Sequence, residues 1–346
     1  MMEKRKRIVY LDLLRIFAVF GVVVIHVSAV GQSEGSNIAL IYNSIVRWAV
    51  PVFFMISGAM FLRNDKEYTF EMMVKKYIPR FLICIAFWGI LYSLLDIYLY
   101  SSFNIKTIIF SFINVITNHS GYHLWFLYAL IALYIMVPVF RVIVKNLTQK
   151  QIAFVIVCWL VLSLGISQFN SITKALNVPI SFDWYFPMIS NWAGYFLLGY
   201  YLFNYDMLNK IKNVLIGLGT VSLFAGILCN FVATAKTGGI IDAFSDQSGL
   251  SSCLVAISIT LIFKQLFNKN YSKKQSSIIQ SISNKTFGIY LVHVLVINVI
   301  FHIFDVKIDV ISQIISIPIF SIAVFVISFL ITFLISKIPV LKKTVM

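Results

Sequence analysis

Charged residues are scarce in this chain of 346 residues, where Asp, Glu, Lys and Arg together make up only 12%. Hydrophobic residues make up 60%, and the mean hydropathy is +0.90. This composition leaves too little polar surface for a soluble globular domain, so the soluble classes are excluded. Apolar runs of about 20 residues recur from end to end, which indicates an integral membrane protein built from many helices.

Acidic residues are the rarer charge, with 13 Asp and Glu against 28 Lys and Arg, and the formal net charge is +15. Such an excess of basic residues can indicate a nucleic-acid partner. Here the Lys and Arg residues fall between the apolar runs, where membrane topology predicts them, so we expect no nucleic acid and a lipid bilayer instead.

Cysteine is also rare, and the spacing of the cysteines does not match a metal site or a redox motif. The four cysteines lie within apolar runs and show no metal or redox spacing: Cys84, Cys158, Cys229 and Cys253. The sequence also lacks a Gly-rich phosphate loop, a Ser-His-Asp order and a cluster of metal ligands. We therefore expect no metal and no bound cofactor, and any catalysis would depend on histidine and arginine inside the membrane.

Length and hydrophobicity predict an all-α polytopic protein with a single membrane domain over residues 8–338 and no soluble domain. About ten spans are predicted: 8–30, 40–62, 77–100, 122–144, 151–169, 187–205, 213–233, 248–268, 285–304 and 311–336. The stretch 105–117 is apolar but short, and it either lies in the interface or re-enters the membrane. The sequence shows no internal repeat, so the commonest signature of transporters is missing.

The basic residues predict the orientation. Twenty Lys and Arg residues lie at the two termini and in alternate connections, whereas the other connections hold four: Lys106, Lys174, Lys236 and Lys307. The positive-inside rule therefore places both termini in the cytoplasm. The N-terminal segment resembles a signal peptide, but Asp12 and Arg15 interrupt its apolar run and no small-residue cleavage site follows, so we interpret it as a retained first helix.

The first span carries the most informative polar residues, which are Asp12, Arg15 and His26. Arg15 and His26 are eleven residues apart, which places them about 20° apart around a helix and roughly 16 Å apart along it. Asp12 lies one turn below Arg15. Three polar side chains on one stripe of a transmembrane helix are costly unless they face protein or a watery cavity. A lone membrane histidine is often a packing residue, but this stripe favours a functional site.

Two further arginines are candidate ligands for a phosphate group. Arg47, in the outer half of the second span, needs an anionic partner or water. The Ser57-Gly58 pair that follows would permit close helix approach. Arg80 follows Lys76 by one turn at the cytoplasmic start of the third span. The Arg80 side chain either extends to lipid headgroups or forms part of a basic entrance that binds the phosphates of a cytosolic donor.

The remaining candidates are aromatic residues and histidines. His123 and Trp125 open the fourth span at the predicted outer face, where an interfacial aromatic belt is the alternative to a substrate site. His293 lies in the inner half of the ninth span.

At these residues the chain resembles the acyltransferase 3 family of bacterial membrane acyltransferases. Arg15 and His26 fit the family's Arg-x10-His motif in the first helix. Similar patterns follow in order: Pro51-Val-Phe-Phe-Met-Ile-Ser-Gly58, His123-Leu-Trp-Phe-Leu127 with Tyr134 and Pro138, Trp192-Ala-Gly-Tyr-Phe-Leu-Leu-Gly199, and Gly288-Ile-Tyr-Leu-Val-His293. Each pattern alone is weakly specific, whereas their order over most of the chain is specific.

The resemblance implies transfer of an acyl group, often acetyl, from acyl-CoA to a hydroxyl of a cell-surface or lipid-linked glycan at the bacterial cytoplasmic membrane. It also implies that Arg15 and His26 matter for activity. His26 would be the general base, and Asp12, Arg47, Arg80, His123, Trp125 and His293 would bind substrates. Many family members carry two arginines at the start of the third helix, where this chain has Lys76 and Arg80.

Two other classes remain open at this stage. Buried His and Arg also suit a proton-coupled transporter or exporter of a sugar or lipid-linked precursor, although the missing repeat and the scarcity of buried acids argue against it. A non-catalytic sensor or scaffold subunit is the third reading.

Overall fold

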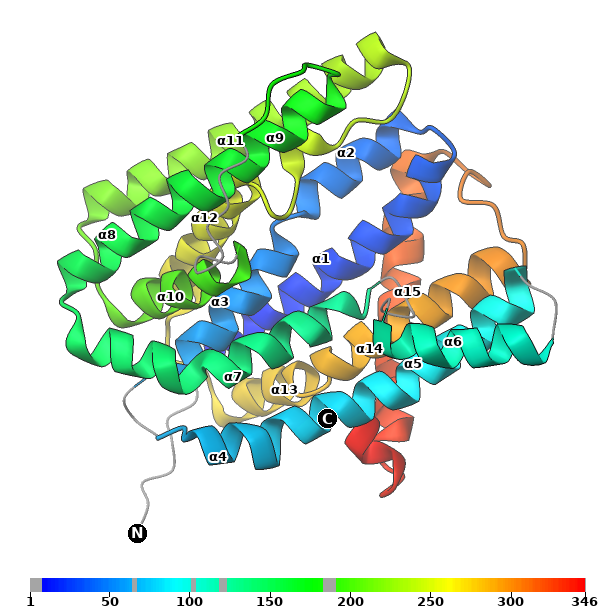
Figure 1. The fold of residues 1–346 in the computed structure, drawn as a ribbon, viewed down its shortest axis with the longest axis horizontal. Helices are drawn as coiled ribbons and strands as arrows, with labels where there is room; N and C mark the ends of the chain where they lie inside the picture. The colour runs from blue at the N-terminus through cyan, green and yellow to red at the C-terminus, as the bar shows by residue number, and fades with distance from the viewer. Residues whose placement is uncertain (1–7, 64–66, 101–103, 118–122, 183–190, 346) are drawn as a thin grey trace. The chain divides into compact units, whose positions relative to one another are not determined.

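The computed structural model describes residues 8–63, 67–100, 104–117, 123–182 and 191–345 (Figure 1). Within these ranges the chain is helical and contains no strand. Nine helical stretches there are long and apolar enough to cross a membrane: Val9–Ser33, Asn37–Phe61, Phe70–Leu99, Trp125–Asn146, Gln149–Ala175, Asn209–Thr237, Leu250–Phe267, Thr286–Ile303 and Gln313–Ile335. The predicted class, an all-α polytopic membrane protein, is confirmed.

The sixth predicted span, 187–205, differs from the other nine. Its first residues lie outside the described ranges, and its described part is helix α10, Asn191–Asn204, with 14 residues. At 1.5 Å per residue such a helix extends about 21 Å, which is shorter than a hydrocarbon core of about 30 Å. The short apolar stretch 105–117 forms helix α6, Ile105–Thr117, which packs on the helix before it.

The described helices form two compact units. Unit 1 comprises Met1–Met60 and Thr148–Thr286. Its elements are α1 (Val9–Ser33), α2 (Asn37–Val46), α3 (Ala49–Phe61), α8 (Gln149–Trp159), the π segment η2 (Leu160–Gly165), α9 (Ile166–Ala175), α10, α11 (Asn209–Thr237), the 3-10 turn η3 (Ala243–Ser245), α12 (Leu250–Phe267) and α13 (Lys273–Ser283). Helix α1 packs against α2, α12 and α13, and α11 packs along α12.

Unit 2 comprises Phe61–Leu147 and Phe287–Met346. Its elements are α4 (Phe70–Met72), η1 (Met73–Tyr77), α5 (Ile78–Tyr100), α6, α7 (Trp125–Asn146), α14 (Thr286–Asn298), η4 (Val299–Ile303), α15 (Gln313–Ile335) and η5 (Leu341–Thr344). Segments η1 and η4 are π-helical, and η5 is a 3-10 turn. Helix α5 packs against α6, α7 and η5.

Local sequence explains where several helices begin and end. Gly35 has a φ of +82°, a left-handed conformation that suits the turn after α1. Ser36 then caps α2 by accepting a hydrogen bond from the Ala39 amide. Thr148 and Ser272 form capping boxes at the starts of α8 and α13. The second predicted span is interrupted at Arg47 and Trp48, where α2 ends and α3 begins.

Helices α3 and α10 contact each other backbone to backbone. A Cβ atom added to Gly58 would overlap the carbonyl group of Phe196, and one added to Gly199 would overlap that of Met55. Glycine at both positions therefore permits an approach that any larger residue would block. The close helix approach predicted at Ser57-Gly58 is confirmed, and its partner is α10.

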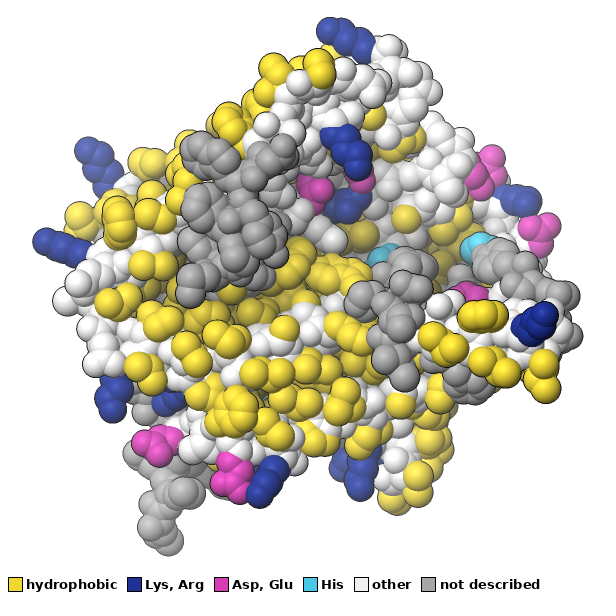
Figure 2. Space-filling model, viewed as in Figure 1, with side chains coloured by type: hydrophobic (Ala, Val, Ile, Leu, Met, Phe, Trp, Pro, Cys, Tyr) yellow, Lys and Arg dark blue, Asp and Glu magenta, His cyan; other side chains and the backbone are white. Residues whose placement is uncertain are grey.

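Hydrophobic side chains cover much of the face in Figure 2. On α11 the large exposed residues include Val221, Phe224 and Leu228, which are 63–67% exposed. Such apolar surface is unfavourable in water but matches lipid hydrocarbon, as expected for a membrane-spanning chain.

Candidate functional site

Helix α1 presents the predicted stripe of polar residues. Asp12 is buried, and its Oδ1 accepts a 2.7 Å hydrogen bond from the hydroxyl of Ser283 at the end of α13. Helix α13 carries Lys273 and Lys274, so this end of the stripe lies at the side for which the basic residues predict the cytoplasm. Arg15 and His26 are half-buried further along the same helix.

The packing of Phe17 shows which side of α1 carries Arg15 and His26. Its ring stacks on Trp48, between α2 and α3, at 5.0 Å and on Phe263 of α12 at 5.2 Å. Ser28, about 20° from Phe17 around the helix, accepts a hydrogen bond from Asn43 of α2, so this side of α1 faces α2 and α12. In an ideal helix Phe17 lies about 160° from Arg15 and about 180° from His26. Arg15 and His26 therefore lie on the side of α1 opposite the one that packs on α2 and α12.

The backbone of α1 beside His26 is held by Asn43 of α2. The Asn43 side-chain amide donates to the carbonyl of Ile25 at 2.9 Å and to the hydroxyl of Ser28 at 3.1 Å. Asn43 and Ser28 are both buried, so these bonds form in a region of low dielectric where they are strong. The residue immediately before His26 is thus anchored to the neighbouring helix.

Arg47 continues this network. Its Nε donates to Asn43 Oδ1 at 2.5 Å, and its guanidinium forms an ion pair with Asp242, which precedes η3. The anionic partner that the sequence analysis required for Arg47 is therefore present. A hydrogen-bonded chain runs from Asp242 through Arg47 and Asn43 to the backbone of α1. The positive charge of Arg47 is therefore paired with the carboxylate of Asp242.

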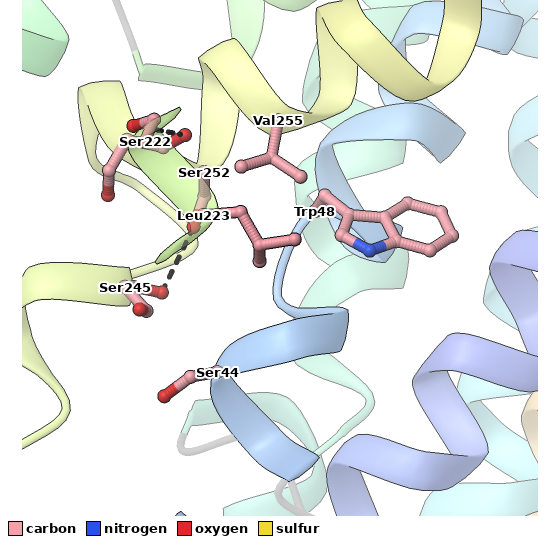
Figure 3. A pocket seen from close by; sticks show the side chains of 8 residues that line it. Ser44, Trp48, Ser222, Leu223, Ser245, Ser252 and Val255 are labelled. Carbon is pink, nitrogen blue, oxygen red and sulfur yellow. Dashed lines mark hydrogen bonds between the residues drawn. The ribbon is translucent and has the colours of Figure 1, made fainter. Parts of the chain in front are cut away.

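A small polar cavity lies in unit 1 near the same network (Figure 3). Its volume is about 10 Å³, and its lining consists of Ser44, Trp48, Ser222, Leu223, Ser245, Ser251, Ser252 and Val255. The buried Asn230 amide donates to the hydroxyls of Ser44 and Ser245 at 3.1 and 3.0 Å. A space of this size holds one water molecule, and it is far too small for a thioester or a sugar.

Unit 2 brings together two histidines that are far apart in the sequence. His123, just before α7, and His293, on α14, are 2% and 0% exposed, and their ring centroids are 5.3 Å apart. Tyr290 closes the cluster because its hydroxyl donates to the His123 carbonyl at 2.6 Å, while the Tyr290 carbonyl lies 2.6 Å from Nδ1 of His293. The structure buries His123 among α5, α7 and α14.

Tyr92 on α5 completes this cluster and was missed by the sequence analysis. Its ring contacts the ring of His123 at 4.8 Å with an interplanar angle of 86°. Nothing in the sequence marks it, because a tyrosine in an apolar span is common at interfaces and in cores. Only the pairing of α5 with α14 shows that it lies beside the two histidines.

The other candidates of unit 2 lie outside this cluster. Trp125 at the start of α7 is half-buried, with its ring 6.2 Å from that of Phe126. Arg80 is exposed near the start of α5. Arg141, near the end of α7, donates to the carbonyls of Phe61 and Arg63 at 2.8 and 2.7 Å.

The fold and these residues define a polytopic membrane protein with arginine and histidine inside its helices. The model of a family described as an acyltransferase domain matches residues 8–337, which is nearly the whole chain. The chain therefore belongs to the acyltransferase 3 family, and it is a membrane acyltransferase. No curated protein and no solved structure matches the chain.

Proposed function

We propose that the protein moves an acyl group, with acetyl as the first candidate, from cytosolic acyl-CoA to a hydroxyl of a cell-surface or lipid-linked glycan at the bacterial cytoplasmic membrane. The observation that carries this proposal is the placement of Arg15 and His26 on one side of α1, opposite the side that packs on α2 and α12. Family membership supports the class of reaction.

The donor would bind through its phosphates. A guanidinium group donates two parallel hydrogen bonds to phosphate oxygens, so Arg15 of unit 1 and Arg80 of unit 2 are each a candidate ligand for a donor phosphate. Arg15 is on the predicted cytoplasmic half of α1, and Arg80 is exposed at the predicted cytoplasmic start of α5. The pantetheine arm of CoA is long and thin, so it would extend along α1 toward His26, which lies roughly 16 Å further along the helix.

His26 is assigned the role of general base. An imidazole accepts a proton from an alcohol near neutral pH more readily than any other side chain. The hydroxyl oxygen would attack the thioester carbonyl, forming the new C–O bond while its proton passes to His26. The C–S bond then breaks, and the leaving thiolate takes the proton from the imidazolium. An arginine or tyrosine would stabilise the negative oxygen of the intermediate.

The remaining candidates receive supporting roles. His123 and His293 are buried, so a substrate would meet them only inside unit 2, and Trp125 would lie at the edge of that region. Asp12 and Arg47 would contribute by fixing α1 and α2, because one is bonded to Ser283 and the other to Asp242.

The test is release of free thiol from acetyl-CoA by the purified protein in lipid nanodiscs. An acyltransferase releases thiol slowly without acceptor and faster with a glycan acceptor, and it labels that acceptor when the acetyl group is radioactive. A protein that binds the glycan or moves it across the bilayer without releasing thiol would refute the proposal and favour a transporter.

A further inference from the structure

The hydroxyl of Tyr92 bonds to two backbone groups of α14. It donates to the carbonyl of Leu291 at 2.7 Å and accepts from the amide of Leu295 at 3.1 Å. These two groups, four residues apart, are the pair that an uninterrupted α-helix bonds directly.

The position of Tyr92 is itself fixed by packing. Its side chain is 1% exposed, and its ring lies 6.1 Å from that of Trp88, one turn earlier on α5. The Trp88 indole donates to the carbonyl of Thr344 at 2.9 Å, which ties α5 to η5. The hydroxyl of Tyr92 is therefore presented to α14 by a rigid support.

His293 lies between the two residues that Tyr92 bridges. The hydroxyl bonds to Leu291 and Leu295, so it fixes the backbone on both sides of His293. The same Tyr92 ring contacts His123 edge to face at 4.8 Å. One side chain thus touches one histidine of the pair with its ring and sets the backbone of the other with its hydroxyl.

The span that begins with α14 departs from regular helical geometry at its end. After Asn298 the helix continues as the π segment η4, Val299–Ile303. Single π turns within α-helices are frequent at functional sites. This π segment begins six residues after His293 and four residues after Leu295.

We propose that Tyr92 is a positioning residue that fixes the backbone of α14 on both sides of His293 and thereby holds the His293 imidazole against His123. This inference rests on the proposed function, in which the two histidines belong to the enclosed part of the substrate site. Tyr92 acts through the histidines. Without its hydroxyl, the carbonyl of Leu291 and the amide of Leu295 would lose their bonds to α5, and the His293 ring would move away from His123.

The experiment compares Tyr92→Phe with Tyr271→Phe in the full-length protein in nanodiscs. Both changes remove one hydroxyl that donates to a backbone carbonyl. The Tyr271 hydroxyl donates to Phe267 in unit 1, whereas the histidine pair belongs to unit 2. Tyr92→Phe should lower kcat for acyl transfer roughly tenfold to a hundredfold, because misplacement by about 1 Å costs that much, and should leave KM for acetyl-CoA unchanged. Tyr271→Phe should behave as the wild type.

A second readout reports position without using activity. With histidine labelled at Cε1, the NMR signals of His123 and His293 should shift in Tyr92→Phe, whereas those of His26 and His302 should not. A double-mutant cycle completes the test: if Tyr92 acts through His293, adding Tyr92→Phe to His293→Gln should cost little further activity.

Two results would overturn the inference. The first is a wild-type kcat in Tyr92→Phe. The second is a loss of activity that only matches the loss of folded protein, while the NMR signals of His123 and His293 stay unchanged. A wild-type protein that releases no thiol would instead refute the proposed function. The histidine signals would then still show whether Tyr92 holds the pair.

Discussion

The Ser283 hydroxyl donates a 2.7 Å hydrogen bond to the Asp12 carboxylate, and both side chains are buried although 271 residues separate them in the sequence. This bond ties the start of α1 to the end of α13. Since a buried carboxylate must be hydrogen-bonded or charge-paired, Ser283 is part of what makes an acidic residue tolerable at this depth.

Ser283→Ala should therefore destabilise the protein. Removing one donor from a buried charged acceptor costs about 1–3 kcal/mol of unfolding free energy. The measurement is the thermal midpoint of unfolding in detergent, monitored as the fraction of protein that remains folded and monodisperse. Ser281→Ala is the matched control, because Ser281 is exposed on the same helix. Equal stability of the two variants would show that the bond to Asp12 contributes nothing.

His26→Ala should abolish acyl transfer while CoA binding is largely kept. Loss of a general base costs roughly 10²–10⁴-fold in rate. The measurement is acetylation of the surface glycan in cells that carry each variant at equal membrane levels, with thiol release by the purified protein as a second assay. His302→Ala, in the exposed last turn of η4, should remain active. Normal acetylation by His26→Ala would remove the base assignment and reopen the transporter reading.

Arg15→Ala and Arg80→Ala should weaken CoA binding and leave the fold intact. One charge-assisted phosphate contact contributes about 1.5–3 kcal/mol, which corresponds to roughly a tenfold to hundredfold change in affinity. The measurement is the Kd for a non-hydrolysable CoA analogue. Lys210→Ala removes an exposed basic residue at the start of α11 and serves as the control for net charge. Unchanged affinity in both arginine variants would assign these residues a structural role.

Gly58→Ala and Gly199→Ala should each disrupt the contact of α3 with α10. The added methyl group would overlap a backbone carbonyl on the facing helix, so at least one helix must move, at a cost of about 1–3 kcal/mol or more. Gly217→Ala provides the contrast, since nothing lies within 4 Å of the added atom there and alanine favours the helix. The readout is the thermal midpoint, and a stability of Gly58→Ala equal to that of Gly217→Ala would contradict the close contact.

The predicted orientation can be checked by labelling single cysteines from outside the cell, after replacement of the four native cysteines. Gly35→Cys and Lys236→Cys should be labelled, whereas Glu67→Cys and Lys273→Cys should be protected. The reason is the asymmetry of basic residues among the connections. The reverse pattern would invert the topology.

The same method tests α10. Both termini can lie in the cytoplasm only if the number of crossings is even, so the nine long stretches require α10 to complete a tenth. Asn177→Cys, after α9, should then be labelled from outside, and Asp206→Cys, before α11, should be protected. Labelling of both positions would show that α10 does not cross.

The amino-acid sequence by itself determined the class of protein, the approximate limits of nine spans, the polar stripe on α1 and the close approach at Gly58. These features depend on local properties: a run of apolar residues long enough to cross a bilayer, a period of 3.6 residues, or a side chain too small to keep two helices apart. Each can be recognised from neighbouring positions alone. The order of the motifs likewise sufficed to predict the family.

Only the tertiary structure decided which distant residues meet. It paired Arg47 with Asp242, Asp12 with Ser283, His123 with His293, and the Tyr92 hydroxyl with the backbone of α14. The interruption of the second span at Arg47 is of the same kind, because the ion pair forms where α2 gives way to α3. In a membrane every helix offers several apolar faces of similar hydrophobicity. The choice among them therefore depends on a few polar contacts and close-packed glycines whose partners lie far away in the sequence.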